Sequence, residues 1–136
     1  MSIPYEKTTL PNGVRVVTGP MTGVKSASLI FSYEVGSRYE PAPIAGVAHF
    51  LEHMLFKGTE KRPDPMQISE AIEGVGGVLN AATGREGTSY WCKIPSTHYA
   101  MAYDVMADIL RNSVIDQSDL DKERSVVIEE IRSIQD

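Results

Sequence analysis

The sequence has little cysteine, no long apolar segment and no concentration of positive charge. Its 136 residues include one cysteine, Cys92, so an internal disulfide and a Cys-x-x-Cys site are excluded. No apolar run approaches the length of a membrane span, and the N-terminus lacks the basic-then-apolar pattern of a signal peptide. The 18 acidic and 13 basic residues give a net charge of −5, without a basic stripe. We therefore expect neither nucleic acid nor a membrane as a partner, and a location in the cytoplasm or an organelle lumen.

The remaining composition is that of a folded domain. Hydrophobic residues make up 42% of the chain, and 136 residues are enough to bury a core. No linker, repeat or low-complexity tract divides the sequence, which predicts a single domain over residues 1–136. Because residues 131–136 are still in helical phase, we expect this domain to be truncated.

Hydrophobic periodicity predicts an alternating series of strands and helices. The β-rich runs are residues 5–10, 14–18, 26–35, 78–83 and 88–94. The helical patterns are residues 46–57, 65–74, 99–111 and 119–135. Asn12-Gly13 predicts a hairpin between the first two strands, Asp64 is expected to cap the second helix, and Asp116 or Ser118 the last. The order predicts an α+β fold, a largely antiparallel sheet with helices packed on one face. Alternation in the last strand predicts that Cys92 is a small buried hydrophobe.

The first predicted helix carries His49, Glu52 and His53 on one face. The spacing His-x-x-Glu-His is the inverse of the common zinc-protease motif. Two histidines one turn apart can converge on a tetrahedral ion, and a carboxylate beside them that is not a ligand can take a proton from the metal-bound water. The alternative is a pair of partly buried histidines with ordinary hydrogen-bond partners. The spacing favours a metal site.

A catalytic zinc takes three protein ligands, so a third is needed from elsewhere. His98 begins a helix, where a surface role is expected. On the last helix Glu123 and Glu130 fall, at three- and four-residue steps, within an apolar stripe, whereas Glu129 lies on the polar side. The apolar members of the stripe are Leu120, Val127, Ile131 and Ile134.

Acids within an apolar stripe need a compensating partner, because burying an unpaired carboxylate is costly. A cation or a hydrogen-bond donor would provide one. The alternative places both acids at the edge of the stripe, in ion pairs with Lys122, Arg124 or Arg132.

The motif at 49–53, followed by Glu130 within residues 123–131, resembles the M16 metallopeptidases, a family that includes pitrilysin, insulin-degrading enzyme and the mitochondrial processing peptidases. Residues 10–14, 76–83 and 88–90 also resemble that family, so the resemblance covers almost the whole chain. Similarity is closest to the two-domain bacterial and processing-peptidase branch. The fold expected from it is part of an M16 peptidase domain.

The resemblance implies one zinc ion per chain, held by His49, His53 and Glu130, with Glu52 as general base. Glu123 matches a further acid of the family, which implies a hydrogen bond to a ligand histidine. Asn80 and Ala81 would belong to an edge strand to which an extended peptide adds. Without the resemblance, Asn80 would be interpreted as a polar residue near a turn.

The function implied is that of a zinc-dependent endopeptidase acting on extended peptides or unfolded segments. Members of the family carry a homologous second half, in the same chain or in a partner subunit. The alternative is therefore a non-catalytic zinc- or peptide-binding module or scaffold subunit, inactive without that half. The intact set of His49, Glu52, His53 and Glu130 favours catalysis. We also expect self-association, because a sheet edge and an unfinished helix layer would be exposed.

Overall fold

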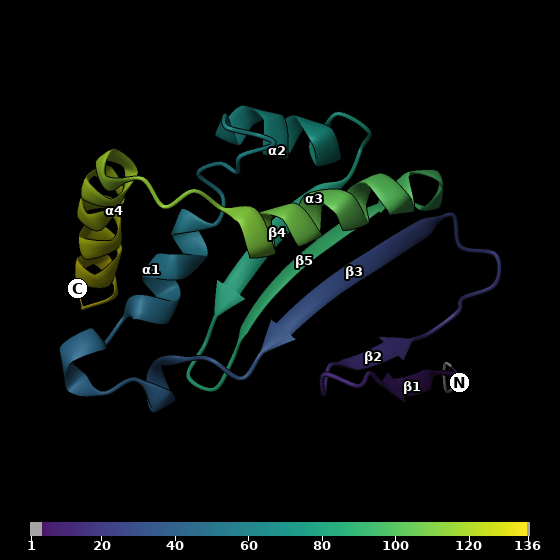
Figure 1. Ribbon diagram of the computed structural model, residues 1–136, viewed down its shortest axis with the longest axis horizontal. Coiled ribbons are helices and arrows are strands. Elements are labelled where there is room, and N and C mark those ends of the chain that lie inside the picture. Colours follow the sequence, from purple (N-terminus) through teal and green to yellow (C-terminus); the bar gives the residue numbers. More distant parts are fainter. Residues whose placement is uncertain (1–3, 136) are drawn as a thin grey trace.

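A computed structural model describes residues 4–135 as an α+β fold in which helices cover one face of an antiparallel sheet (Figure 1). The strands are β1 (Glu6–Thr9), β2 (Arg15–Thr18), β3 (Ser26–Tyr33), β4 (Val78–Thr83) and β5 (Thr88–Pro95). The helices are α1 (Val47–Met54), α2 (Pro65–Glu73), α3 (Tyr99–Asn112) and α4 (Gln117–Gln135), with short 3-10 turns at Ser37–Tyr39, Ala42–Ile44 and Ser96–His98. The predicted fold class is confirmed. Within residues 4–135, no helix combines the length and apolar character needed to cross a membrane.

The first two strands form a hairpin of their own. Its turn contains Gly13 at φ 86°, a backbone conformation that glycine adopts without steric cost. The amide of Gly13 donates to the carbonyl of Leu10 (2.9 Å), as the Asn-Gly signal predicted. Both strands are exposed along their length. They form a two-stranded sheet of their own, and β3, β5 and β4 form another. The predicted strands are therefore present, but they are divided between two sheets.

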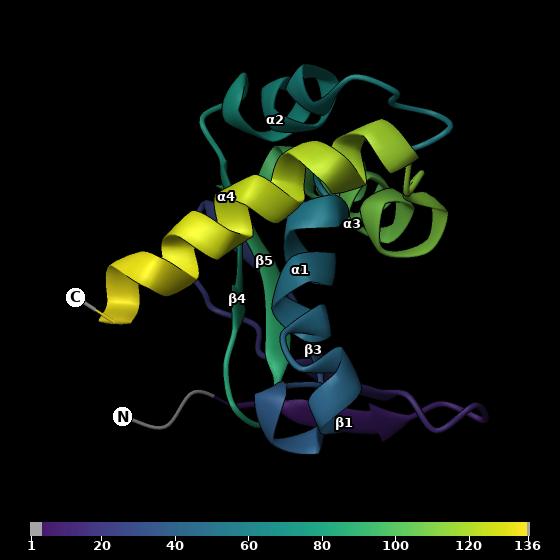
Figure 2. The same cartoon turned by 90° about the vertical axis from the view of Figure 1, so that its left-hand side faces the viewer.

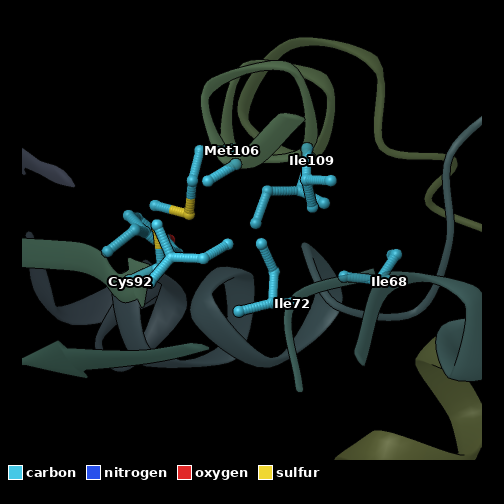
Figure 3. Close-up of a cluster of buried hydrophobic side chains, with 9 residues drawn as sticks. Ile68, Ile72, Cys92, Met106 and Ile109 are labelled. Atoms are coloured by element: carbon cyan, nitrogen blue, oxygen red, sulfur yellow. The ribbon is translucent and has the colours of Figure 1, made fainter. Parts of the chain in front are cut away.

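The main sheet has the order β3-β5-β4 and is antiparallel throughout. On the central strand β5, alternate side chains point into the core, and Cys92 is fully buried there. Figure 3 shows that Ile68 and Ile72 of α2, Met106 and Ile109 of α3, and Cys92 belong to one cluster of buried side chains. Full burial of such side chains stabilises the fold by about 1.5–3 kcal/mol each. Cys92 is a buried hydrophobe as predicted, and burial raises the pKa of its thiol.

The two helices that matter most for the site are far apart in the sequence. In Figure 2, α4 lies across α1, and α1 is the element on which α4 mainly packs. α1 is shorter than the predicted helix and ends at Met54, after which residues 55–57 form a turn and a bend. Asp64 caps α2 as predicted, with its carboxylate accepting the amide of Met66 at 2.9 Å. Asp116 caps α4 by accepting the amide of Ser118 at 2.7 Å.

Candidate metal centre

Three side chains from α1 and α4 point their ligand atoms at one position. His49 and His53 lie one turn apart on α1, and their Nε2 atoms are 3.1 Å apart. Glu130 reaches the same position from α4, and its Oε2 atom is 3.5 Å from each of the two Nε2 atoms. All three side chains are partly buried. The structure thus brings together the two local histidines and the remote carboxylate.

The separations of these atoms fit a tetrahedral zinc ion. Two zinc–ligand bonds of about 2.0–2.1 Å at the tetrahedral angle separate their donor atoms by roughly 3.3 Å. The observed separations of 3.1 Å and 3.5 Å lie on either side of that value. Two imidazoles and one carboxylate are also a donor set that catalytic zinc sites use, with a fourth position left for water.

Glu52 lies beside this group and is anchored to the sheet. The hydroxyl of Thr83, the last residue of β4, donates to Oε2 of Glu52. The hydroxyl of Thr88, opposite on β5, lies 3.2 Å from that of Thr83 and 2.8 Å from the carbonyl oxygen of Val35. Burial raises the pKa of Tyr90 to about 12, and the negative charge of Glu52 adds to the shift. One carboxylate oxygen of Glu52 is therefore held by the hairpin formed by β4 and β5.

Glu123 lies behind His53 and is buried. Its Oε1 atom is 2.8 Å from Nδ1 of His53, and its Oε2 atom is 2.5 Å from Nζ of Lys57. Burial alone would raise the pKa of Glu123, but the hydrogen bonds from Lys57 and His53 outweigh it and lower the pKa. The alternative of ion pairs along α4 is wrong for Glu123. Lys122, Arg124 and Arg132 pair instead with Asp119, Asp121 and Glu129.

The apolar stripe predicted on α4 is present only in its first part. Val127 is buried and Leu120 is half-buried, but Ile131 is 45% exposed. The side chain of Ile134 lies outside the described residues. The prediction of a continuous buried stripe through Ile131 is wrong, because α4 crosses α1 and its last turns extend to one side of that helix (Figure 2). The register of the stripe nevertheless brings Glu123 and Glu130 to the α1 side.

The other candidate ligands lie away from the histidines. Glu129 is exposed on the outer side of α4 in an ion pair with Arg132. His98 is exposed in the 3-10 turn before α3. Neither residue belongs to the group of ligand atoms that the described residues form.

Glu40 is a residue of the site that sequence reasoning missed. Its two carboxylate oxygens accept the amides of Gly46 (2.6 Å) and Ala48 (2.7 Å) at the start of α1. Gly46, at φ 94°, is the N-cap residue and has no side chain with which to cap. An acid shortly before a helix that lacks a capping Ser, Thr, Asp or Asn was the available signal.

Asn80 and Ala81 lie on β4, at the edge of the three-stranded sheet. β4 pairs with β5 on one side, and no other described strand pairs with its outer edge. Asn80 is exposed, and its side-chain oxygen accepts the amide of Ala81 at 2.8 Å. Their role towards a peptide stays a prediction.

Several known proteins are similar to almost the whole of this chain. A protein of Streptomyces coelicolor named as an uncharacterized zinc protease is 44% identical over 130 residues, which are 96% of this chain and 28% of the relative. A probable mitochondrial-processing peptidase subunit beta of Arabidopsis thaliana is 43% identical over 94% of this chain and 24% of its own length. The crystal structure of a protease from Helicobacter pylori matches with a TM-score of 0.87 and 30% identity, over 96% of this chain and 31% of that chain.

Relatives named as a zinc protease and as a processing-peptidase subunit thus define the class of protein to which this chain is similar. The chain belongs to the insulinase family, peptidase family M16, whose model matches residues 15–136. It spans 24% to 31% of the length of these three proteins.

Proposed function

We propose that residues 1–136 are the N-terminal zinc-binding part of an endopeptidase of the inverted His-x-x-Glu-His type. The observation that carries this proposal is the convergence of the Nε2 atoms of His49 and His53 and the Oε2 atom of Glu130, with Glu52 next to them. The family and the zinc proteases among its relatives support the same chemistry. One zinc ion per chain follows from the single set of ligand atoms in the described residues.

Each residue of the site has a defined task in peptide-bond hydrolysis. Zinc, when bound, supplies a Lewis acid that lowers the pKa of a water molecule towards about 7 and polarises a carbonyl group. Glu52 accepts a proton from the water and later gives it to the leaving amine. Glu123 accepts the Nδ1 proton of His53, which fixes the tautomer whose Nε2 lone pair is free for the ion.

The substrate proposed is an extended peptide or unfolded segment. Such a peptide can add to the outer edge of β4 by main-chain hydrogen bonds, next to Asn80 and Ala81. The relative named as a processing-peptidase subunit supports a partner, either a homologous second domain or a second subunit. Exposure of the β4 edge also supports self-association.

A second candidate function is that of a zinc- or peptide-binding module or scaffold subunit without turnover. The observation that favours it is the unpaired outer edge of β4 among the described strands, which can bind a peptide whether or not the peptide is cleaved. The two functions differ in whether a zinc-loaded preparation cleaves a quenched fluorescent peptide in a chelator-sensitive way. Zinc binding without such cleavage would support the module.

The test of the catalytic role uses Glu52→Gln. We expect this variant to keep one zinc ion per chain after dialysis and to lose hydrolysis by about 100-fold or more, because an amide cannot take up the proton. Glu60→Gln, at an exposed position outside the site, is the control and should behave like the parent. Undiminished turnover in Glu52→Gln would disprove the assignment of the base.

The ligand set is tested by Glu130→Gln. An amide is a weaker zinc ligand than a carboxylate, so we expect less zinc after dialysis, measured by atomic absorption. Glu129→Gln changes the neighbouring exposed acid and should retain zinc. If Glu130→Gln keeps its metal while Glu129→Gln or His98→Ala loses it, the third ligand is assigned wrongly.

A further inference from the structure

Lys57, Glu123 and His53 form a line of polar contacts that ends at the metal position. Nζ of Lys57 is 2.5 Å from one oxygen of Glu123, and the other oxygen is 2.8 Å from Nδ1 of His53. The side chain of Lys57 is 30% exposed and that of Glu123 is 8% exposed. The line therefore runs from the partly exposed ammonium group, through a buried carboxylate, to the imidazole whose Nε2 faces His49 and Glu130.

The backbone around Lys57 is fixed on both sides. Its amide donates to the carbonyl of Met54 at 3.1 Å, and the carbonyl of the next residue, Gly58, accepts the amide of Val114 at 3.0 Å.

Gly58 has φ 143°, and a Cβ there would lie 2.7 Å from the carbonyl oxygen of Pro63. Thr59 is fully buried, and its hydroxyl donates to Asp108 of α3 at 2.7 Å. Lys57 is thus presented to α4 from a rigid segment.

Among the described residues, Lys57 is the basic side chain that pairs with Glu123. The cations of α4 itself are engaged elsewhere, with Asp119, Asp121 and Glu129. A carboxylate held by His53 alone could turn about its own axis and let the imidazole turn with it. With its second oxygen fixed by Lys57, the carboxylate keeps its first oxygen beside Nδ1 of His53.

We propose that Lys57 is a positioning residue for the metal centre. It orients Glu123, which in turn holds the ring of His53 so that Nε2 points at the position shared with His49 and Glu130. This inference rests on the proposed metal site. It differs from simple compensation of a buried charge, because compensation would change the stability of the apo chain without changing the orientation of His53.

The experiment measures zinc affinity of the purified chain by competition with a chromogenic chelator at fixed pH and salt. We expect Lys57→Met to lower the affinity about tenfold, since loss of an outer partner of a ligand histidine typically costs 10- to 100-fold. Lys57→Arg restores the contact and should recover most of the affinity. Lys61→Met is the matched control, because Lys61 pairs with the exposed Asp104 and should leave affinity unchanged.

Two further readouts separate positioning from stability. In ¹⁵N NMR of the apo chain, His53 should be a single Nδ1–H tautomer in the parent and a mixture in Lys57→Met. In a double-mutant cycle, Lys57→Met should have no added effect on affinity when Glu123 is already Gln. Glu123→Gln also removes the negative charge that needs compensation. The two variants that carry Glu123→Gln can therefore be compared with each other even if Lys57→Met alone unfolds.

The outcomes distinguish a wrong role for Lys57 from a wrong metal site. An affinity of Lys57→Met within twofold of the parent, or an added loss in the Glu123→Gln background, would overturn the role of Lys57. If His49→Ala binds zinc as well as the parent, the metal site itself is wrong and this inference falls with it. If His49→Ala loses zinc and Lys57→Met does not, only the role of Lys57 is refuted.

Discussion

At the scale of single residues, Glu52 has two different oxygens. Oε2 receives the hydroxyl of Thr83, whereas no hydrogen bond from a described residue reaches Oε1. The carboxylate is therefore fixed at one atom and available at the other. A group that must take up and release a proton without changing place benefits from such an arrangement, because the cost of orienting it has been met in folding.

Removal of the Thr83 hydroxyl should slow hydrolysis without removing zinc. A hydrogen bond to a charged group contributes about 1.5–3 kcal/mol, so we expect Thr83→Val to lower kcat roughly tenfold or more. Thr83→Ser keeps the hydroxyl and should retain most of kcat. The measurement is kcat and KM on a quenched peptide together with zinc content, with the exposed Thr97→Val as control. Equal kcat for Thr83→Val and the parent would show that the contact does not position the base.

At the scale of elements, the start of α1 depends on a residue outside it. Glu40 accepts two amides of the first turn, and the segment that carries it is bound to the turn between β4 and β5. The amide of Arg38 donates to the carbonyl of Arg85 at 2.8 Å, and its side chain pairs with Glu86. Gly36 is required there, because a Cβ would lie 2.5 Å from the carbonyl oxygen of Gly84. These contacts fix the start of α1, the helix that carries the histidines, relative to the sheet.

Glu40→Ala should destabilise α1. Loss of a helix cap costs about 0.5–2 kcal/mol, and two amides are left without their partner, so we expect the free energy of unfolding to fall by about 1–2 kcal/mol. Urea denaturation followed by circular dichroism measures this change. Glu34→Ala removes an exposed acid of the same region and should change stability by less than about 0.5 kcal/mol. A Glu40→Ala chain as stable as the parent would contradict the capping role.

Much at this scale was predictable from local pattern. The hairpin at Asn12-Gly13 and the Asp64 cap follow from signals only a few residues long, and both are confirmed. Three-residue and four-residue steps on α4 placed Glu123 and Glu130 on the side that meets α1. Lys57 as the partner of Glu123 was not predictable, since the contact joins residues far apart in the chain. The exposure of Ile131 was not predictable for the same reason, because it depends on how far the contact between α4 and α1 extends.

At the scale of the whole molecule, a polar network joins the segment after α1 to α3. Asp108 is 5% exposed and accepts hydrogen bonds from Thr59, Arg62 and Asn112. Burial alone would raise the pKa of Asp108, but these hydrogen bonds outweigh it and hold the pKa below its ordinary value. The ionised form is thus the one that the fold stabilises. The network fixes the segment that follows α1 relative to α3.

Stability should fall in acid partly through this network. Because the pKa of Asp108 is lower in the folded than in the unfolded chain, its contribution is complete above the unfolded value of about 4 and is lost as pH falls through the folded value. We expect Asp108→Asn to cost about 2–3 kcal/mol near pH 7. The difference from the parent should shrink as pH falls from 6 to 3. Chemical denaturation across that range tests this, with the exposed Asp121→Asn as control. A difference independent of pH would contradict it.

The ligand atoms come from α1 and α4, and this division has a thermodynamic consequence. An ion held by both helices would act as a cross-link between two segments far apart in the sequence, formed only when α4 is docked on α1. Its binding free energy would then be linked to folding, adding about 2.7 kcal/mol at a free zinc concentration 100 times Kd. Amide hydrogen exchange along α4 would follow free zinc, while the core over Cys92 would exchange at its own rate. Bound zinc would therefore also determine for how much of the time α4 is docked on α1.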